Sequence, residues 1–267
     1  MGGFPGAGAD PEGADYAVVG APLDVSATFR PGARFGPERV RRFARPFDDY
    51  DRRTDRRLPD LLTDAGDVDP WDDAAGYLDF LAGRLSDHHR AGRLPLVVGG
   101  EHTVTVAGLR AADPDVYVCL DAHLDLYESY AGNELSHATV TRHALDVADE
   151  AVLLGARTGS ESEWDRAARS DVTVVPPDEV PEWRLDADGD VYLSVDVDAA
   201  DPAFAPAAGT PEPFGLRPRE LRRVVRATAP SAVGFDVVEV TDRDDGQTAS
   251  LAAKLLREFV FAHADGA

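Results

Sequence analysis

The sequence predicts a single α/β domain built on a mostly parallel sheet. Short apolar runs recur along the 267 residues, and segments with helical spacing separate them, which is the pattern of successive βαβ units. Three of these runs end in aspartate or histidine, as expected where ligands bind beyond the carboxyl ends of parallel strands. We assign residues 15–267 to this domain. Residues 1–14, rich in Gly, Ala, Pro and acidic residues, are expected to be a flexible lead-in.

The first half of the chain alternates apolar runs with helical patterns. Pro37 marks a first helix, because proline suits a first helical turn, and this helix is expected to run through Val40 and Phe43. Leu78, Leu81 and Leu85 are spaced as on one face of a helix. In chain order we expect a strand at 16–20, a loop at 21–36, the helix from 37, an exposed segment at 47–57, a short strand at 61–63, a helix at 71–90, a strand at 94–98, a helix at 103–111 and a strand at 116–120.

The second half continues the alternation and ends in a helix. Leu251, Leu255, Leu256 and Phe259 lie on one side of that closing helix. In chain order we expect a polar loop at 126–136, a helix beginning near Ser136, a strand at 152–155, a helix at 161–168, a strand at 172–175, a strand at 191–195, a Pro/Gly-rich loop at 199–216, a helix at 218–227, a strand at 232–238 and a helix at 249–263.

The chain is strongly acidic. Its 27 Lys and Arg residues against 49 Asp and Glu give a net charge of −22, which argues against nucleic acid as a partner. Lys254 is the only lysine, and aspartate outnumbers glutamate. We interpret this surface as an adaptation to high salt, where screening weakens the repulsion between carboxylates. The alternative is an ordinary acidic protein from a GC-rich genome, which would also favour Arg over Lys.

Cysteine usage and hydropathy indicate a soluble, cytoplasmic protein. Cys119 is the only cysteine, so an intrachain disulfide is excluded, and its place inside a strand predicts a small core residue. No N-terminal run resembles a signal peptide. No apolar stretch approaches the roughly 20 residues that span a bilayer, so no membrane partner is expected.

Asp121, His123 and Asp125 follow the apolar run at 116–120 at every second position. In an extended backbone alternate side chains share a face, so these three can point into one small volume. Two carboxylates crowded together repel each other unless a positive charge lies between them, and a divalent metal is the simplest candidate. The alternative interpretation is a polar strand end whose Asp-His-Asp is solvated.

Two further runs favour the metal interpretation. Asp196 and Asp198 follow the run at 191–195, and His102 follows the run at 94–98 and two glycines. Four carboxylates and two imidazoles suit two divalent ions, and such ligands without thiols favour Mn²⁺ over a structural zinc site. Mg²⁺ fits less well with two histidines. Two ions that share a water lower its pKa, so that hydroxide is present near neutral pH.

The chain resembles the ureohydrolase family, and within it the agmatinases, over nearly its whole length from about residue 16. Several long motifs in the right order carry the resemblance. They are GGEH at 99–102, DAHLD at 121–125, SVDVDAADP at 194–202 followed by APA at 205–207, FRPGARFGP at 29–37, GTPEP at 209–213 and FDVVEV at 235–240.

This resemblance implies a three-layer α/β/α fold and a binuclear centre with two Mn²⁺ per subunit. One ion would take His102, Asp121, Asp125 and Asp196, and the other would take His123, Asp121, Asp196 and Asp198. Glu239 matches the acid that holds the substrate guanidinium, a role that suits a carboxylate facing a planar cation; the alternative for Glu239 is a surface acid after a strand. His137 matches the family's proton-handling histidine.

The reaction implied is attack of a metal-bridging hydroxide on a guanidinium carbon, followed by collapse to urea and a primary amine. Within the family, the acidic loop at 127–137 resembles the agmatinase version, which would make agmatine the substrate and putrescine the product, as in polyamine biosynthesis. Glu128 or Glu134 could favour the amine of such a substrate, or either could be a solvated surface acid.

Two departures from the family pattern keep other substrates open. Phe214-Gly215-Leu216 stands where a second glycine is usual before the leucine, and Thr241-Asp242 replaces the usual Asn-Pro. Aminopropylagmatine, guanidinobutyrate, arginine and formiminoglutamate are the alternatives to agmatine. The resemblance also implies a homotrimer or homohexamer.

Two rival functions come from other classes. The first is a catalytically silent oligomeric homologue, against which the complete ligand set argues. The second is a zinc amide hydrolase on a related fold, which would use one metal and fewer carboxylates.

Overall fold

An eight-stranded sheet in which every pairing is parallel forms the centre of the molecule. The computed structural model describes residues 3–71, 73–186 and 189–266. The strand order is β4-β1-β5-β10-β9-β6-β7-β8. The bounds are β1 Tyr16–Ala21, β4 Leu62–Asp67, β5 Leu94–Gly99, β6 Val116–Leu120, β7 Glu150–Leu154, β8 Val172–Val175, β9 Val191–Asp196 and β10 Ala232–Val238. The predicted α/β class with a parallel sheet is confirmed.

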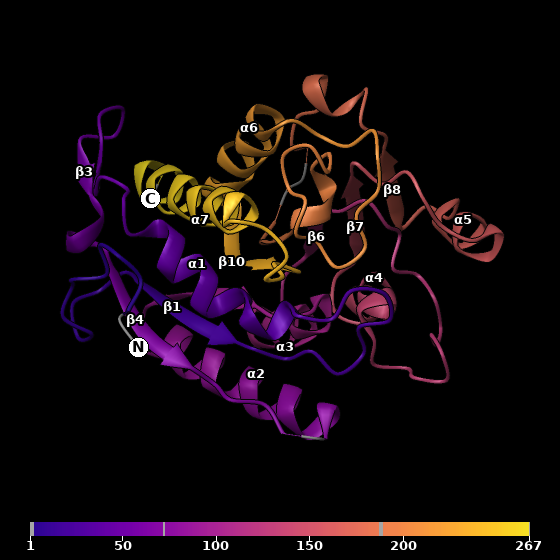
Figure 1. Ribbon diagram of the computed structural model, residues 1–267, viewed down its shortest axis with the longest axis horizontal. Coiled ribbons are helices and arrows are strands. Elements are labelled where there is room, and N and C mark those ends of the chain that lie inside the picture. The colour runs from indigo at the N-terminus through magenta and orange to yellow at the C-terminus, as the bar shows by residue number, and fades with distance from the viewer. Residues whose placement is uncertain (1–2, 72, 187–188, 267) are drawn as a thin grey trace.

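Helices cover both faces of this sheet (Figure 1), which confirms the three-layer arrangement. Helix α7 packs against both α1 and α6 on one face, and α3 packs against both α2 and α4 on the other. The bounds are α1 Gly36–Ala44, α2 Ala74–Arg90, α3 Thr105–Ala112, α4 Val140–Ala144, α5 Glu161–Ala167, α6 Pro218–Thr228 and α7 Gln247–Gly266.

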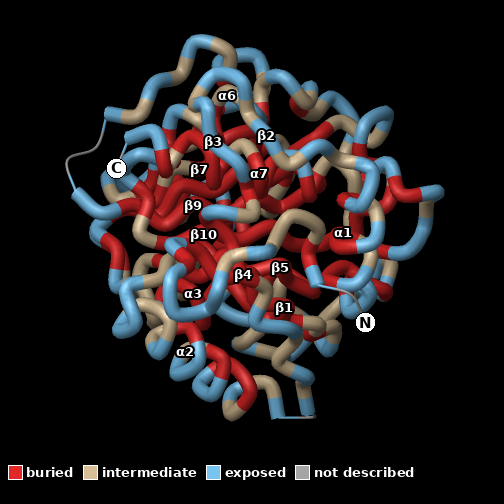
Figure 2. Tube along the Cα trace, turned by 90° about the vertical axis from the view of Figure 1, so that its left-hand side faces the viewer, coloured by how far each residue is buried: buried red, intermediate tan, exposed pale blue. Residues whose placement is uncertain are grey.

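Alternating side chains of the central strands enter separate hydrophobic clusters. In β5, Leu96 and Val98 join the cluster that contains Phe235 and Phe259 under α7, whereas Val97 joins the cluster under α2 and α3. Because successive side chains of a strand point to opposite faces, a strand buried on both faces must be apolar throughout. Figure 2 shows the result, with buried strands at the centre and exposed segments outside.

Three elements differ from the expectation. The strand expected at 61–63 is the six-residue β4, whose second half is polar because it lies at the edge of the sheet. The helix expected near Ser136 is a 3-10 turn, His137–Thr139, followed by the short α4. The segment 47–57, expected only to be exposed, contains a small antiparallel ladder of β2 (Tyr50–Asp51) and β3 (Arg56–Arg57).

The described part of the N-terminal lead-in packs against the domain. Phe4 is 2% exposed and belongs to the largest hydrophobic cluster. The backbone N–H of Phe4 donates to the Asp64 carboxylate, and that of Ala9 donates to the carbonyl of Leu62. These contacts place the segment along the outer edge of β4. Its flexibility, and the division at residue 15, stay predictions.

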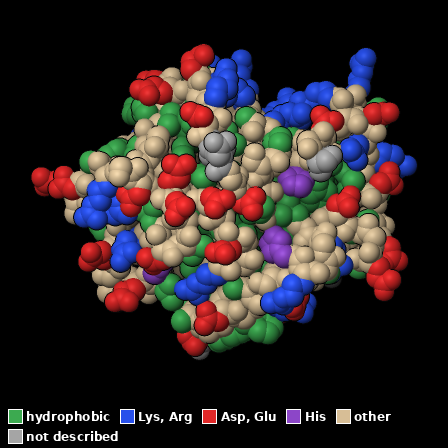
Figure 3. Space-filling model, turned by 180° about the vertical axis from the view of Figure 1, so that it is seen from behind, with side chains coloured by type: hydrophobic (Ala, Val, Ile, Leu, Met, Phe, Trp, Pro, Cys, Tyr) green, Lys and Arg blue, Asp and Glu red, His purple; other side chains and the backbone are tan. Residues whose placement is uncertain are grey.

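The surface matches the acidic composition. Figure 3 shows Asp and Glu side chains spread over the face seen from behind, with Arg side chains among them. Adaptation to high salt stays a prediction. Among the helices of the described ranges, none has the length and apolar composition that crossing a membrane requires.

One buried ion pair joins α1 to the edge strand. The Arg41 guanidinium donates from Nε to Asp64 Oδ2 at 2.8 Å and from Nη2 to Asp64 Oδ1 at 2.9 Å, and it also contacts Asp67. Burial alone would raise the pKa of Asp64, but Arg41 outweighs it and holds the pKa below its usual value.

We expect Arg41→Leu to lower the free energy of unfolding by about 3 kcal/mol at neutral pH, because it leaves the Asp64 carboxylate buried without its partner. Denaturant titration measures the change. The deficit should shrink as pH falls below the usual carboxylate range, because the pair's contribution is lost when Asp64 is protonated. The matched control is the exposed neighbour Arg42, whose change to Leu should cost less than about 0.5 kcal/mol. Equal losses for the two variants would contradict the assignment.

Candidate metal centre

Four adjacent strands deliver the candidate site residues to one edge of the sheet. In the order β5-β10-β9-β6, each strand ends in or next to a polar side chain of the site. His102 begins a 3-10 turn after β5, Glu239 follows β10, Asp196 ends β9 and Asp121 follows β6. The predicted convergence at the carboxyl ends of parallel strands is therefore observed.

A first group of ligand atoms surrounds the Nδ1 atom of His102. Its distances are 3.1 Å to Asp121 Oδ2, 3.0 Å to Asp125 Oδ2 and 3.6 Å to Asp196 Oδ2. All four side chains are less than 10% exposed. One imidazole nitrogen and three carboxylate oxygens thus face a common point.

A second group lies beside the first and shares Asp121 with it. His123 Nδ1 is 3.0 Å from Asp198 Oδ2 and 3.5 Å from Asp121 Oδ1. Asp121 therefore turns one oxygen to each histidine. Backbone N–H groups hold the carboxylates: His123 N donates to Asp121 at 2.7 Å, Asp198 N donates to Asp196 at 2.8 Å and Ala122 N donates to Asp198 at 3.0 Å.

The predicted alternation of Asp121, His123 and Asp125 along an extended strand is wrong. Strand β6 ends at Leu120, so these residues do not alternate on an extended strand. Residues 121–125 instead form an irregular loop. Asp125 in this loop has a φ of 51°, in the left-handed region. Within this loop Asp121 accepts the backbone N–H of His123, and Glu163 accepts that of Leu126.

The residues present fit a pair of divalent cations. His102 Nδ1 is buried and makes no hydrogen bond within the described residues, although three carboxylate oxygens surround it. Crowded buried carboxylates disfavour one another's charge. Burial, together with the neighbouring Asp121 charge, raises the pKa of Asp125 to about 7. Burial likewise raises the pKa of Asp196, reinforced by Asp198 and Asp121.

The two imidazoles carry the positive charge when no metal is bound. Burial lowers the pKa of His123, but the carboxylates of Asp198 and Asp121 outweigh it and raise the pKa well above its usual value. Burial also lowers the pKa of His102, but its neighbours Tyr117 and Cys119 and the hydrogen-bonding carboxylates of Asp121 and Asp125 outweigh burial and raise the pKa well above its usual value. Protonated imidazoles in turn hold the pKa of Asp121 below its usual range, against the effect of its burial.

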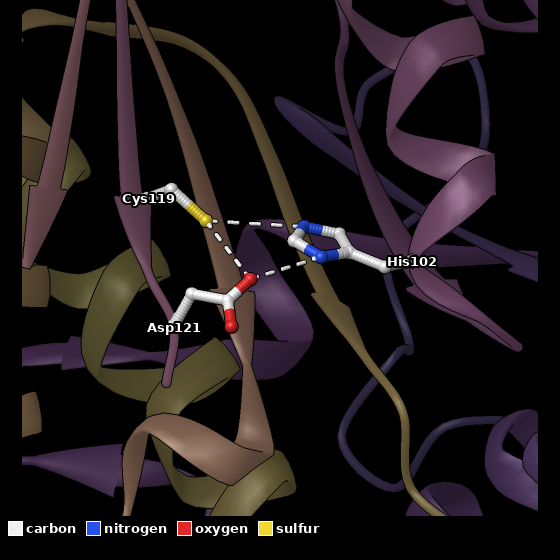
Figure 4. A group of neighbouring side chains, drawn as sticks. All are labelled: His102, Cys119 and Asp121. Carbon is white, nitrogen blue, oxygen red and sulfur yellow. Dashed lines mark hydrogen bonds and ion pairs between the residues drawn. The ribbon is translucent and has the colours of Figure 1, made fainter. Parts of the chain in front are cut away.

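Cys119 lies next to His102 and Asp121 (Figure 4), at 3.8 Å from His102 Nε2 and 3.9 Å from Asp121 Oδ2. Burial raises the pKa of its thiol to about 12. The thiol lies by Nε2 of His102, whereas Asp125 and Asp196 face Nδ1, so it does not share the point that the four ligand atoms of the first group face. It is fully buried and belongs to a hydrophobic cluster, as the sequence predicted.

A second layer of polar side chains, which the sequence analysis missed, orients His102. Its Nε2 lies 3.1 Å from the Ser194 hydroxyl, which donates to Asp236 Oδ1 at 2.6 Å. The Tyr192 hydroxyl donates to the other oxygen of Asp236 at 2.9 Å. This chain directs Nδ1 toward the carboxylates, as partners of metal-binding histidines do. The available signal was a set of polar residues inside strands that are otherwise apolar.

Arg157 was also missed. Its guanidinium donates to the carbonyl oxygens of Asp198 at 2.9 Å and Glu212 at 2.8 Å, and also to those of Gly155, Ala199 and Pro213. It thereby ties the end of β7 to the loop that carries Asp198. No sequence pattern around Arg157 predicts this role, because all of its acceptors are backbone carbonyls, which any residue type can supply.

Glu239 is buried beside the first group. Its Oε1 accepts the backbone N–H of His102 at 2.8 Å. Its φ of 64° turns the chain sharply after β10. A Cβ at Gly209 would lie 2.5 Å from Oε2, so only glycine leaves room for this carboxylate. Burial raises the pKa of Glu239 to about 8.

His137 lines a cavity of about 370 Å³ that opens over the second group. His123, Asp125, Tyr127 and Tyr130 line the same cavity, and the Tyr130 and His137 ring centroids are 5.7 Å apart. Glu163, which the sequence analysis did not single out, is a second buried acid of the cavity wall besides Asp125. Glu128 and Glu134 are exposed and lie outside the described lining.

Comparison with known proteins places this geometry in context. A model described as "Arginase family" matches residues 14–262. The chain is 34% identical to an agmatinase of Pyrococcus horikoshii, with 92% of this chain and 91% of that protein covered. It is 36% identical to a proclavaminate amidinohydrolase of Streptomyces clavuligerus, with 95% and 90% covered. The solved structure of an agmatine ureohydrolase of Thermoplasma volcanium superposes with a TM-score of 0.90 at 34% identity, with 99% and 95% covered.

The charge state of the site predicts that binding of a divalent metal releases protons. At pH 7 the raised pKa values keep protons on the imidazoles of His102 and His123, and a metal must displace them. We expect titration of the metal-free protein with Mn²⁺ in weak buffer to release at least two protons per subunit. Apparent affinity should rise about tenfold per pH unit for each proton displaced. Binding without proton release at neutral pH would contradict this charge assignment.

Proposed function

The chain belongs to the arginase family and is a hydrolase of its agmatinase type, and from that premise we propose that it cleaves agmatine to putrescine and urea with two Mn²⁺ ions per subunit. The observation that carries the proposal is the pair of histidine–carboxylate groups that share Asp121, with Glu239 buried at their side.

The proposed ligand assignment takes the two groups as observed and adds Asp196, which lies in the first group, as a ligand shared with the second. His102, Asp121, Asp125 and Asp196 would hold one ion, and His123, Asp121, Asp196 and Asp198 the other. When bound, two such ions supply a hydroxide nucleophile near neutral pH, because coordination lowers the pKa of a shared water. The chemistry of the donor set favours Mn²⁺, since the described ligand groups offer imidazole and carboxylate and the nearest thiol is neutral.

Glu239 is suited to orient the guanidinium. One of its oxygens is fixed by the N–H of His102, which sets the plane of the carboxylate relative to the first group. A guanidinium is planar and presents paired N–H donors, so a fixed carboxylate can bind it bidentately. The cation would also lower the raised pKa of Glu239 and favour its ionised form.

His137 is suited to deliver the proton that the leaving amine requires. That group must gain and lose a proton near neutral pH. Burial lowers the pKa of His137, and the positive charges of His102 and His123 lower it further. The imidazole is therefore neutral at pH 7 and can take up a proton from the nucleophile before passing it to the amine.

The cavity lining supports a substrate with a cationic tail. Its described members include Asp125, Glu163 and the faces of Tyr127 and Tyr130, and no Lys or Arg is among them. An amine suits acidic and aromatic neighbours, and the net charge of −22 attracts cations. The carboxylate of arginine would meet no Lys or Arg side chain in this lining. Agmatine is thus favoured, and aminopropylagmatine is the second candidate because its longer tail is also cationic.

Assembly as a homotrimer or homohexamer and location in the cytoplasm belong to the same proposal. The silent homologue remains the alternative from another class. The complete set of six ligand residues argues against this alternative. Histidine Nδ1 atoms and carboxylate oxygens of the set lie 3.0–3.6 Å apart, and the backbone N–H of Asp198 donates to the Asp196 carboxylate.

A urea-release assay with Mn²⁺-loaded protein in molar KCl tests the proposal. Agmatine, aminopropylagmatine, guanidinobutyrate and arginine are assayed in parallel. We expect urea from agmatine above all, and none from Asp121→Ala, which removes the ligand shared by both groups. Urea release from another compound would support the proposed mechanism but would show that agmatine is not the substrate. Two bound metals without urea from any compound would favour the silent homologue.

Glu239→Gln should lower kcat/KM for agmatine by about 10²-fold, because it removes a charge-assisted bidentate contact. Metal content, measured in parallel, should stay at two ions. The exposed Glu179 provides the matched control, and its change to Gln should leave kcat/KM within twofold. Normal turnover by Glu239→Gln would remove this residue from substrate binding.

A further inference from the structure

A buried chain of hydrogen bonds leads from Glu101 to His137 through Ser26. Glu101 is completely buried. Its Oε1 accepts the Ser26 hydroxyl at 2.9 Å, and its Oε2 accepts the Ser26 backbone N–H at 2.7 Å. Thr103 donates its hydroxyl to Oε1 at 2.8 Å. Ser26 is thereby clamped by both oxygens of one carboxylate.

The same Ser26 hydroxyl oxygen contacts His137 twice. The backbone N–H of His137 donates to it at 3.0 Å, and the ring Nδ1 lies 3.1 Å from it. Ser26 belongs to the loop after β1, and His137 begins the 3-10 turn before α4. One hydroxyl therefore joins two loops at the cavity that holds the candidate proton-transfer group.

Counting protons at this oxygen fixes the tautomer of His137. A serine hydroxyl has one proton and two acceptor lone pairs. Its proton goes to Glu101, and one lone pair accepts the backbone N–H of His137. The remaining lone pair faces Nδ1, so Nδ1 must carry a proton. Competing partners are more distant: Thr103 Oγ1 is 3.4 Å from Ser26 Oγ, and Ser136 Oγ is 3.4 Å from Nδ1.

We propose that Ser26 and Glu101 are positioning residues that hold neutral His137 as its Nδ1–H tautomer and leave Nε2 as the nitrogen that exchanges the reaction's proton. This proposal rests on the proposed function of His137. Within the described residues, Nε2 of His137 has no hydrogen-bond partner, which agrees with an atom reserved for substrate. The tautomer matters because a ring with its lone pair on Nδ1 would present a proton to the cavity and could not act as the base.

The tautomer can be read by two-bond ¹H–¹⁵N correlation of histidine rings in the full-length, metal-free protein at about pH 8, where the neutral ring dominates. His137→Gln identifies the His137 signals by their loss. We expect the wild-type ring to show a protonated Nδ1 and an unprotonated Nε2. Ser26→Ala should shift the ring toward the Nε2–H form, and Ser26→Thr, which keeps the hydroxyl, should restore the wild-type pattern. The control is Ser231→Ala at an exposed serine.

Glu101→Gln gives an independent arm. A glutamine can donate to Ser26 Oγ, which frees the serine proton for Nδ1, so this variant should also move His137 toward the Nε2–H form. Melting temperatures and metal content confirm that each variant folds and loads. An unchanged His137 tautomer in folded Ser26→Ala would overturn the proposal.

Kinetics completes the test. With agmatine, Ser26→Ala should lower kcat about 3- to 10-fold, the effect of one hydrogen bond, with KM within twofold. A shifted tautomer with unchanged kcat would overturn the link to proton transfer. If the wild-type protein releases no urea from any guanidino compound, the proposed function fails, while the ring signals still decide whether Ser26 and Glu101 fix His137.

Discussion

The crowding of buried carboxylates at one sheet edge is the constraint on which the rest of this structure depends. Asp121, Asp125, Asp196 and Asp198 lie within contact of two imidazoles, at a depth where unpaired charge is strongly disfavoured. In the loops, one oxygen of each of three carboxylates, Asp121, Asp196 and Asp198, accepts a hydrogen bond from a backbone N–H. The other oxygen is left for a cation, or for a protonated histidine when no cation is bound.

Rigid support for these loops comes from polar groups that themselves have to be satisfied inside the core. In the middle of the sheet, the Asp236 carboxylate accepts hydrogen bonds from the hydroxyls of Ser194 and Tyr192. The Arg157 guanidinium donates hydrogen bonds to backbone carbonyls of the loops around Asp198. A half-satisfied network would be worse than an apolar core. The fixed geometry of the ligands therefore depends on residues that never face the cavity.

The central strands could be predicted because their burial on both faces makes them continuous apolar runs, and the ligands could be predicted because each follows such a run closely. The edge strand β4 was underestimated because an edge tolerates Asp and Gly. The roles of Ser26, Glu101 and Arg157 were beyond sequence reasoning. Each acts through partners 40 or more residues away, and only the folded topology brings those partners together.

The place of β10 in the sheet has a consequence for how the protein is made. This last strand lies between β5 and β9, which do not pair with each other. Until it is inserted, β4-β1-β5 and β9-β6-β7-β8 are separate half-sheets, with His102 on one and Asp121 and Asp196 on the other. A ribosome synthesises the chain from the N-terminus, so we expect the nascent polypeptide to be inert until β10 (Ala232–Val238) has emerged. Premature termination would then yield no partly active enzyme.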